Sequence, residues 1–570
     1  MPTIEIFQDR IYIRSELSER ELIKQVPGTR WDKEQSMWHA PLSWGTCIAL
    51  RQIFGQFLTM GDELREWATQ IRAYKIDPAM ALRPAMEAPE LMASEPDLYP
   101  FQRVGVRFLE TAQHALIADD MGSGKTIQII RALARLKAYP VLVVCPNSMK
   151  LVWEEEIQKW DPDRTTSVIG GTASQRKKAI KYEADYYIVN WESLRLHTNL
   201  APYGSLALTD REKEPKELNE IEWAAVVADE AHRAKDAKSK QTRALWAVSR
   251  QTKIRFAATG TPIESHPGEL WSVMNFVSPD NFPVKTKYVE RYCHQTFNPF
   301  GGMEIEGLRA DTAAEFHAIV DPIMIRRPKD MILPQLPEKM ETVRWIPMST
   351  KQEKAYRQMQ ETMIAELADD TVTVALNPLA QFIRLSQFAS SYAGLEGDKV
   401  RLELPSNKVE AFVELLEEAG TEPVVAFAES KQLINLAASV IDKLGISIGL
   451  ITGDTTPDQR QAYIRDFQEG NLRVMLCTSA GAEGITLTAA RILVFLQRFW
   501  SSIKNAQAAD RVHRIGQERG VDIITFASIG TVDEHREKVL KDKGVALEEI
   551  LQDDSIRQEM LRWGSKKRRK

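Results

Sequence analysis

The sequence has few of the features that mark secreted, zinc-stapled or membrane-embedded proteins. Only four cysteines occur in 570 residues and none form a C-x-x-C pair, which argues against a structural zinc site and a disulfide framework. Apolar runs such as Val141–Val144 are too short to span a bilayer, and the N-terminus lacks a basic start with an apolar stretch. The net charge of −5 excludes coating of nucleic acid by bulk charge, so any such contact must be local. We expect a reducing compartment: the cytoplasm of a bacterium or of a viral host cell, or the nucleus of a eukaryote.

Length and composition predict a globular protein of several domains. The chain is 44% hydrophobic and 27% charged, and it is too long for one ordinary domain. Residues 1 to about 42 alternate like short strands, and a helical pattern follows to about residue 75. The Pro- and Met-rich stretch Asp77–Pro100 predicts a linker. We assign residues 1–90 to a small N-terminal α+β domain.

Two series of short apolar runs follow, each run ending in a polar loop and then a helical pattern. Continuous runs of this kind are typical of parallel strands buried on both faces, so two series predict an α/β fold of two tandem lobes, each with a doubly wound parallel sheet. The runs are Ala115–Ala118, Val141–Cys145, Tyr186–Val189, Ala224–Ala228 and Ile254–Ala258, then Val424–Phe427, Ser447–Ile451, Val474–Cys477, Ile492–Leu496 and Asp522–Phe526. We place the first lobe at 95–338 and the second at 339–550, with a helical insertion at about 340–407. The basic tail at 551–570 fits a phosphate-contacting arm, a nuclear import signal or a solvated run.

A glycine-rich loop follows the first apolar run and precedes a helical pattern. Its residues are Asp119, Asp120, Met121, Gly122, Ser123, Gly124, Lys125 and Thr126. Backbone N–H groups at a helix N-terminus can cradle phosphates, Lys125 would reach the β- and γ-phosphates, and the Thr126 hydroxyl would hold Mg²⁺. Asp119 stands where the full pattern has its first glycine. The loop alone therefore leaves open an ordinary glycine turn with a solvated lysine.

Two adjacent carboxylates, Asp229 and Glu230, follow the fourth run of the first series. Ligands of doubly wound sheets bind at this edge, where Asp229 would hold Mg²⁺ and Glu230 would polarise the attacking water. A solvated loop is the competing interpretation, and the combination with the glycine-rich loop favours the catalytic one.

These motifs together resemble helicase superfamily two, and more specifically its Swi/Snf-related group, over roughly residues 95–545. The first-lobe segments that carry the resemblance are Tyr99–Gln102, Met121–Thr126, Val144–Ser148, Asn190–Leu194, Asp229–His232, Thr259–Pro262 and Arg326–Arg327. Those of the second lobe are Thr452–Asp454, Thr478–Leu487 and Gln507–Gln517, the last being the most diagnostic. The resemblance implies two tandem RecA-like lobes, the first of which binds ATP, with ATP and Mg²⁺ as cofactors. It places Gln102 at the adenine base and Gly481 and Gln507 beside the nucleotide.

Two arginines of the last segment, Arg511 and Arg514, lie three residues apart on a predicted helix and hence on one face. Arginines supplied across a cleft stabilise the charge of phosphoryl transfer, so closure of the lobes would couple hydrolysis to a step along the strand. A solvated Arg-x-x-Arg face is the alternative, which the neighbouring motifs disfavour.

Contacts to a nucleic-acid backbone are expected at the ends of predicted strands, where N–H groups and hydroxyls can bind phosphates without reading bases. The candidates are Pro146, Asn147, Ser148, Asn190, Thr452, Gly453, Asp454, Thr478, Ser479, Ala480 and Trp500. Helix capping is an equally good explanation for each serine and threonine. The chain departs from the group's Trp-Asn-Pro at Trp500–Ser502 and from its usual polar run at Glu264–His266.

The resemblance implies a DNA-dependent ATPase that translocates on double-stranded DNA and remodels forks or reanneals strands. Its partner would be duplex or forked DNA of any sequence, no membrane is implied, and protein partners are unknown. A strand-separating DNA or RNA helicase and a nucleotide-gated DNA-binding scaffold remain as alternatives. The hairpin with Trp31 and Trp38 is weakly similar to the accessory module of the HARP annealing helicases, which makes residues 1–90 an accessory domain and a candidate for recognising DNA structure. A small domain with two core tryptophans explains the hairpin equally well.

Overall fold

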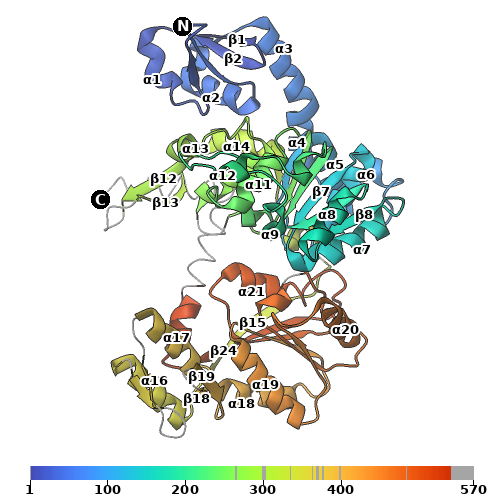
Figure 1. The fold of residues 1–570 in the computed structure, drawn as a ribbon, viewed down its shortest axis with the longest axis vertical. Helices are drawn as coiled ribbons and strands as arrows, with labels where there is room; N and C mark the ends of the chain where they lie inside the picture. The colour runs from blue at the N-terminus through green and yellow to red at the C-terminus, as the bar shows by residue number, and fades with distance from the viewer. Residues whose placement is uncertain are drawn as a thin grey trace. The chain divides into compact units, whose positions relative to one another are not determined.

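The computed structural model describes residues 2–263, 266–297, 303–333, 335–362, 364–366, 372–374, 378–396, 399–482, 484–538 and 540. Contacts divide the chain into two compact units, Met1–Ile332 and Leu333–Ala546, and each is described by itself (Figure 1). The predicted tail at 551–570 lies outside the described residues, as do Glu264, Ser265 and Glu483. Within the described residues, no helix is long and apolar enough to cross a membrane.

The first unit begins with a five-stranded sheet of order β3-β4-β2-β1-β5 (Figure 1). Its strands are β1 (Thr3–Phe7), β2 (Arg10–Arg14), β3 (Arg30–Asp32), β4 (Met37–Pro41) and β5 (Thr59–Met60). Gln8 and Asp9 join β1 to β2 with φ angles of 49° and 58°, the left-handed backbone of a tight hairpin turn. Helix α2 (Trp44–Phe54) packs Leu50 against the isoleucines of one sheet face. The predicted alternating strands are therefore present.

The stretch predicted to be a linker is folded into the first unit. Helices α3 (Asp62–Ile71) and α4 (Asp77–Leu82) follow each other through a π-helical turn, Arg72–Ile76. Beyond them, Ala88, Leu91 and Leu98 are buried in the core beneath the next sheet. The linker prediction was wrong because the Pro- and Met-rich composition hides the small and apolar side chains that pack there.

A seven-stranded parallel sheet forms the main part of the first unit, in the order β14-β6-β11-β10-β7-β9-β8. Its strands are β6 (His114–Ile117), β7 (Val141–Cys145), β8 (Thr166–Ile169), β9 (Tyr186–Asn190), β10 (Ala225–Asp229), β11 (Ile254–Ala258) and β14 (Met324–Ile325). Helices α5 (Pro100–Ala112), α6 (Lys125–Leu136) and α7 (Lys150–Trp160) cover one face. Helices α11 (Lys240–Val248) and α12 (Leu270–Val277) cover the other. The five predicted runs are its inner strands, which apolar side chains bury on both faces.

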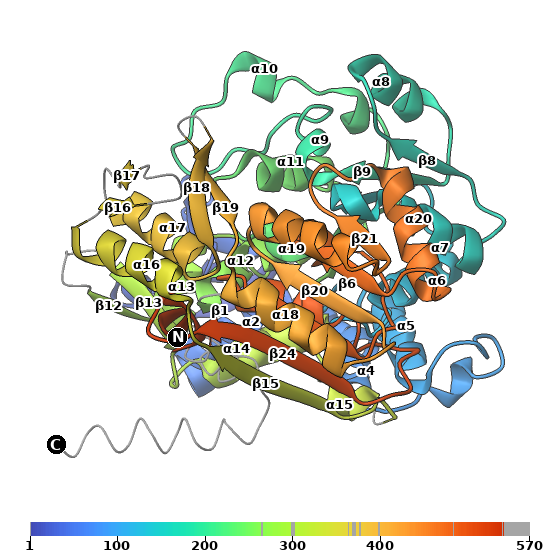
Figure 2. The same cartoon turned by 90° about the horizontal axis from the view of Figure 1, so that it is seen from below.

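A six-stranded parallel sheet forms the second unit, in the order β15-β24-β23-β20-β22-β21. Its strands are β15 (Lys339–Ile346), β20 (Val424–Ala428), β21 (Ile448–Ile451), β22 (Val474–Cys477), β23 (Ile492–Gln497) and β24 (Val521–Ser528). Helices α18 (Asn407–Glu418) and α19 (Lys431–Lys443) cover one face (Figure 2), and α20 (Pro457–Gln468) and α21 (Ser502–Ala509) cover the other. The predicted fold class of two doubly wound lobes is thus confirmed.

The stretch 340–407, predicted to be helical, contains strands as well as helices. β15 pairs with β24 over eight residues at the sheet edge. Helices α16 (Thr350–Thr362) and α17 (Pro378–Phe388) are accompanied by two hairpins, β16 (Ile364–Glu366) with β17 (Val372–Val374) and β18 (Tyr392–Glu396) with β19 (Lys399–Glu403). The prediction was wrong for β15 because charged side chains interrupt its apolar pattern, which is typical of an edge strand.

Candidate nucleotide site and nucleic-acid contacts

Three predicted motifs of the first unit meet at the carboxyl edge of its parallel sheet. The glycine-rich loop follows β6, Asp229 ends β10, and Thr259 follows β11, which lies between those two strands. A Cβ atom added to Gly260 would lie 2.5 Å from Met121 Cγ, so the loop and the Thr259 segment are in close contact. His232 Nδ1 lies 3.0 Å from Thr259 Oγ1 and links the acidic segment to the same place. This is the edge at which doubly wound sheets bind ligands.

The glycine-rich loop has the backbone of a phosphate cradle. Gly122 and Gly124 have φ angles of 78° and 75°, which a side chain would strain, and Gly124 caps the start of α6. A Cβ atom at Gly124 would lie 2.4 Å from Gln102 Nε2. Ser123 is fully buried, and its Oγ atom has no hydrogen-bond partner among the described residues. Left-handed glycines, a helix N-terminus and a buried hydroxyl without a partner fit a nucleotide's phosphates.

Lys125 points back over this loop. Its Nζ atom donates to the main-chain oxygens of Asp119 at 2.8 Å and Asp120 at 3.1 Å. Burial lowers the pKa of Lys125, while the nearby carboxylates, Glu230 and then Asp119 foremost, oppose that shift. The ammonium group therefore lies in the field of the acidic pair, where a cation next to phosphate is expected.

Asp229, the first residue of the acidic pair, is fixed by two indole N–H groups. Its Oδ2 atom accepts a hydrogen bond from Trp153 Nε1 at 2.8 Å, and its main-chain oxygen accepts one from Trp191 Nε1 at 3.0 Å. Burial and then the charge of Glu230 raise the pKa of Asp229 to about 6, against the hydrogen bond from Trp153. A divalent cation favours the ionised carboxylate, so Asp229 fits Mg²⁺. Thr126, in the first turn of α6, stays the predicted second ligand.

Glu230 has an unusual backbone. Its φ angle of 49° lies in the left-handed region, which costs a non-glycine residue free energy and is concentrated at functional sites. His232 Nδ1 lies 3.3 Å from Glu230 Oε2. The strained backbone and this contact orient the Glu230 carboxylate next to the loop.

Gln102, the predicted adenine-binding residue, contacts the loop and its own helix. Its Nε2 atom donates to the Ser123 main-chain oxygen at 3.1 Å, and its Oε1 atom accepts from Tyr99 N at 3.1 Å. The side chain is 2% exposed. Gln102 therefore lies against the glycine-rich loop (the nucleotide loop, residues 119–126), and its contact with a base stays a prediction.

The candidate DNA contacts of the first unit lie at the same sheet edge. Pro146, Asn147 and Ser148 follow β7, and Asn190 ends the neighbouring β9. Asn147 is exposed, whereas Asn190 is 8% exposed and donates through Nδ2 to Glu192 Oε2 at 2.8 Å. The structure brings these residues together, and their contact with DNA stays a prediction.

The second unit gathers its candidate contacts in the same way. Thr452, Gly453 and Asp454 follow β21, and Thr478, Ser479 and Ala480 follow the neighbouring β22. Thr478 N donates to the Ile451 main-chain oxygen at 3.0 Å, which joins the two strand ends. Asp454 forms an ion pair with Lys431. The lysine's positive charge reduces the repulsion that the Asp454 carboxylate would exert on a phosphate backbone.

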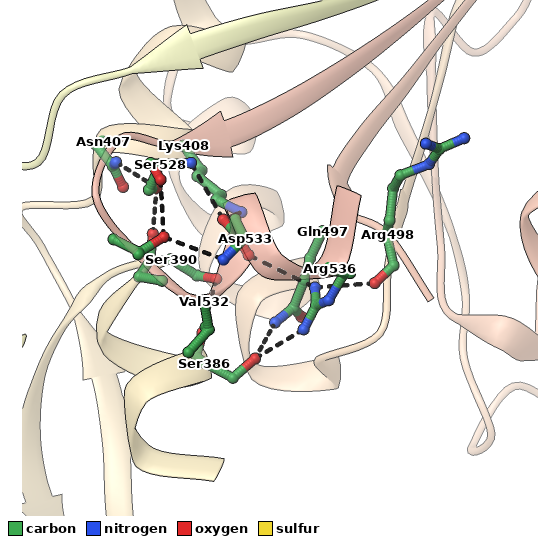
Figure 3. Close-up of polar contacts among 12 residues, drawn as sticks. Ser386, Ser390, Asn407, Lys408, Gln497, Arg498, Ser528, Val532, Asp533 and Arg536 are labelled. Atoms are coloured by element: carbon green, nitrogen blue, oxygen red, sulfur yellow. Dashed lines mark hydrogen bonds and ion pairs between the residues drawn. The ribbon is translucent and has the colours of Figure 1, made fainter. Parts of the chain in front are cut away.

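Trp500, after β23, lies over a buried guanidinium. The Arg536 guanidinium is 4.4 Å from the Trp500 ring centroid, and this arginine is 1% exposed. Arg536 donates to the Arg498 main-chain oxygen at 3.0 Å and to Ser386 Oγ at 2.9 Å (Figure 3). Cation–π stacking on a fixed arginine restricts the indole to one orientation. Trp500 is thus held in place by polar contacts that its sequence neighbourhood did not predict.

Arg511 and Arg514 do not lie on a helix, so this prediction was wrong. Helix α21 ends at Ala509, and turns follow it. Gln517 Nε2 donates to the Ala490 main-chain oxygen at 2.8 Å, and His513 Nε2 lies 2.9 Å from that of Pro337. These side chains draw the segment onto the rest of the unit instead of letting the helix continue.

The two guanidinium groups nevertheless converge. Arg511 Nη1 and Arg514 Nη1 both donate to the Ile485 main-chain oxygen, at 3.3 and 3.4 Å. Gln507 and Gly481, predicted to lie beside the nucleotide, are buried. A Cβ atom at Gly481 would lie 2.7 Å from Cys477 Sγ, so close packing explains this glycine within the unit. Contact of these four residues with nucleotide stays a prediction.

Comparison with known families decides the assignment. Residues 101–389, about half of the chain, match the SNF2-related domain. Residues 407–516 match the helicase conserved C-terminal domain. The chain belongs to the SNF2-related family. This membership confirms the predicted family and, with the two parallel sheets, the two RecA-like lobes.

Relatives of this SNF2-related chain include YwqA of Bacillus subtilis, 28% identical over 80% of this chain and 49% of that protein. The DNA annealing helicase and endonuclease ZRANB3 of Bos taurus is 28% identical over 76% of this chain and 39% of its own length. A solved SWI2/SNF2 ATPase core of Sulfolobus solfataricus in complex with double-stranded DNA is 25% identical, with 79% of this chain and 92% of that chain covered and a TM-score of 0.37. The chain spans half or less of the length of these two curated relatives.

Two residues of the SNF2-related site were missing from the sequence-based list of site residues. Trp153 binds the Asp229 carboxylate, and Arg327 binds Asp119 at the start of the loop. Arg327 lies inside a segment that carried the family resemblance, and Trp153 lies five residues after another, Val144–Ser148. The resemblance therefore offered a signal for Arg327, but the motif chemistry assigns no role to an indole or to a second arginine.

Proposed function

We propose that this chain is a DNA-dependent ATPase that translocates on double-stranded DNA with ATP and Mg²⁺, remodelling forks or reannealing strands. The observation that supports it best is the convergence of the glycine-rich loop, the Asp229–Glu230 pair and Thr259 at one sheet edge. Each of these motifs alone has an ordinary structural explanation, such as a glycine turn or a solvated loop. Such explanations do not account for the contact among the three motifs.

The proposed roles in the first unit follow from the geometry. The loop N–H groups and Lys125 bind the phosphates, and Gln102 binds the base. Thr126 and Asp229 hold the metal ion. Mg²⁺, when bound with ATP, supplies positive charge to the phosphate oxygens. Asp229 suits this role because two indole N–H groups fix the residue at its carboxylate and main-chain oxygens.

Glu230 and the second unit complete the proposed mechanism. The Glu230 carboxylate orients the attacking water and accepts its proton, and its strained backbone fixes the direction from which it does so. Arg511 and Arg514 stabilise the charge that develops on the γ-phosphate. Because they come from the other unit, hydrolysis requires closure, and closure moves the strand-end residues that grip the DNA backbone.

Duplex DNA is the proposed partner because backbone groups, rather than base-reading side chains, dominate the candidate contacts. The relative ZRANB3 is named as a DNA annealing helicase, which favours the same class of substrate. The curated relatives extend well beyond the matched core. The biological pathway and any partner recruitment are therefore not part of this proposal.

The test compares the ATPase rate with no nucleic acid and with single-stranded DNA, duplex DNA, forked DNA and RNA, followed by unwinding and reannealing assays. We expect duplex or forked DNA to stimulate most, and reannealing without extensive unwinding. Greater stimulation by RNA would contradict the choice of DNA. Robust unwinding of long duplexes would favour the strand-separating helicase, and DNA binding without turnover would favour the scaffold.

A further inference from the structure

A buried ion pair joins the end of β14 to the nucleotide loop. Arg327 Nε donates to Asp119 Oδ1 at 3.0 Å, and Arg327 Nη2 donates to Asp119 Oδ2 at 2.5 Å. The side chains of Arg327 and Asp119 are 1% and 0% exposed. Asp119 occupies the loop position where the full phosphate-binding pattern has glycine. The departure from that pattern therefore has a specific partner 208 residues further along the chain.

The remaining donors of Arg327 contact two other parts of the same site. Nη1 donates to the Phe101 main-chain oxygen at 2.7 Å, one residue before Gln102. Nη2 also lies 3.2 Å from Gln128 Oε1 in α6. The guanidinium additionally lies 5.5 Å from the Phe101 ring centroid. One side chain thus connects the loop, the helix that carries Gln102 and the helix that begins with Lys125.

The backbone around Arg327 reinforces this connection. Ala118 N donates to the Ile325 main-chain oxygen at 2.7 Å, and Lys329 N donates to Asp120 Oδ2 at 2.9 Å. Lys125 Nζ donates to the main-chain oxygens of Asp119 and Asp120. Asp119 and Asp120, whose main-chain oxygens bind the Lys125 ammonium group, are therefore themselves bound by the segment around Arg327. The second unit begins only a few residues later, at Leu333.

We propose that Arg327 is a positioning residue for ATP hydrolysis: its ion pair with Asp119 fixes the loop that places Lys125 and ties that loop to the segment entering the second unit. A buried ion pair contributes little net stability relative to apolar packing, so stability alone does not account for it. The planar fork of arginine fixes a carboxylate in direction as well as distance, which a lysine cannot do. The proposal rests on the proposed ATPase function.

The test compares Arg327→Lys with a matched control, Arg291→Lys, in the full chain. Arg291 in α13 (Lys285–Tyr292) forms a largely buried bidentate pair with Glu315 in α14 (Ala313–Val320), with side chains 9% and 1% exposed and both bonds 2.6 Å long. Neither Arg291 nor Glu315 contacts the nucleotide loop through any hydrogen bond of the described residues. Both variants should lose similar thermal stability. Because misplacement by about 1 Å costs about 10²-fold, kcat should fall by about 10- to 100-fold in Arg327→Lys and stay within about twofold in Arg291→Lys.

Two further measurements keep the outcome decisive. Binding of a fluorescent ATP analogue should weaken less than kcat falls, because loss of positioning affects the transition state more than the ground state. Asp119→Asn, which keeps the side-chain size, should reproduce the kcat loss and should not add to it in the double variant. Kinetics of folded Arg327→Lys that match those of Arg291→Lys would overturn the proposal. If Arg327→Lys does not fold, wild-type kcat in Asp119→Asn would overturn it. A wild-type chain without ATPase activity would instead overturn the proposed function.

Discussion

The two units present their charged residues in opposite ways. In the first, Asp229 is 8% exposed at the end of a central strand, and indole N–H groups fix it. In the second, Arg511 and Arg514 are partly exposed, lie in turns and share one neutral carbonyl oxygen of Ile485. A charge-assisted hydrogen bond to a phosphate is stronger than one to a neutral carbonyl oxygen, so these donors suit an incoming phosphate. Fixed acids in one unit and converging, partly exposed arginines in the other fit the proposed enzyme, in which closure brings them together.

The largest expected effect is the loss of the two converging arginines. We expect Arg514→Ala and Arg511→Ala each to lower kcat by about 10³- to 10⁵-fold, the range for arginines that stabilise phosphoryl transfer. Binding of a fluorescent ATP analogue should change less than about threefold, because the first unit holds the nucleotide. Single-turnover hydrolysis at saturating ATP and duplex DNA measures the first quantity.

Arg519→Ala is the matched control for these arginines. Arg519 lies five residues after Arg514 and also donates to a main-chain oxygen, that of Ala489, at 2.9 Å, but it pairs with Glu422. Its loss should leave kcat within about twofold. Equal effects in the three variants would mean that general disruption of the segment, and not the two converging guanidinium groups, causes the loss.

The next effect concerns the fixed acid Glu230. Glu230→Gln keeps the side-chain size and removes the base, so we expect kcat to fall by about 10²- to 10⁴-fold with ATP binding retained. Glu192→Gln is a suitable control, since Glu192 pairs with Arg233 at 3.0 Å on the same sheet edge outside the acidic pair. Unchanged turnover in Glu230→Gln would remove Glu230 from the mechanism and with it the contrast between the units.

The pH dependence of turnover tests the burial of Asp229. Because the pKa of Asp229 is raised to about 6, the group takes up a proton and loses its metal-binding form below that pH. With MgATP held constant, we expect kcat/KM to fall about tenfold for each pH unit below about 6. Asp163→Asn, which changes an exposed carboxylate of the same unit, should leave this profile unaltered.

The stability of the protein separates this effect from unfolding. A carboxyl with a raised pKa holds its proton more tightly in the folded state than in the unfolded chain. Charged Asp229 therefore destabilises the fold above pH 6, and this cost disappears as the pH falls toward 4. We therefore expect that protonation of Asp229 does not lower the melting temperature, so that unfolding caused by Asp229 does not explain the loss of activity below pH 6. Activity that falls in step with the melting temperature would contradict the assignment.

The sequence predicted the parts of this molecule where composition and chemistry coincide. The ten apolar runs are strands because side chains bury both of their faces, and Lys125, Asp229 and Thr259 meet because parallel strands place their carboxyl ends at one edge. It failed at β15, where a charged edge strand has no apolar run, and at Arg511, where side-chain bonds to main-chain oxygens end a helix. The pairing of Arg327 with Asp119 was also missed, because a contact across 208 residues has no local signal, even though Arg327 lies in a family motif.

The smallest expected effect on activity concerns the N-terminal sheet, and here the structure changes where the chain should be cut. We proposed residues 1–90 as an accessory domain, but Ala79 and Ala88 lie in the core beneath the seven-stranded sheet, and Arg83 pairs with Asp321 at 2.7 Å. Removal of 1–90 should therefore lower the melting temperature by several degrees, since it opens a cavity and leaves a buried charge unpaired.

Removal of residues 1–61 should spare that core. The polar contacts between this segment and the rest of the unit include two from helix α2: Trp44 Nε1 donates to the Ala318 main-chain oxygen at 3.1 Å, and Gly45 N donates to Asn281 Oδ1 at 2.7 Å. With Leu64→Lys to solubilise the uncovered face of α3, the shortened chain should keep its basal ATPase rate within about twofold, because neither contact reaches the nucleotide loop. The preference between forked and duplex DNA should change if the sheet recognises DNA structure. An unchanged preference would mean that the N-terminal sheet contributes only packing. Loss of the basal rate would mean that ATP hydrolysis requires the sheet.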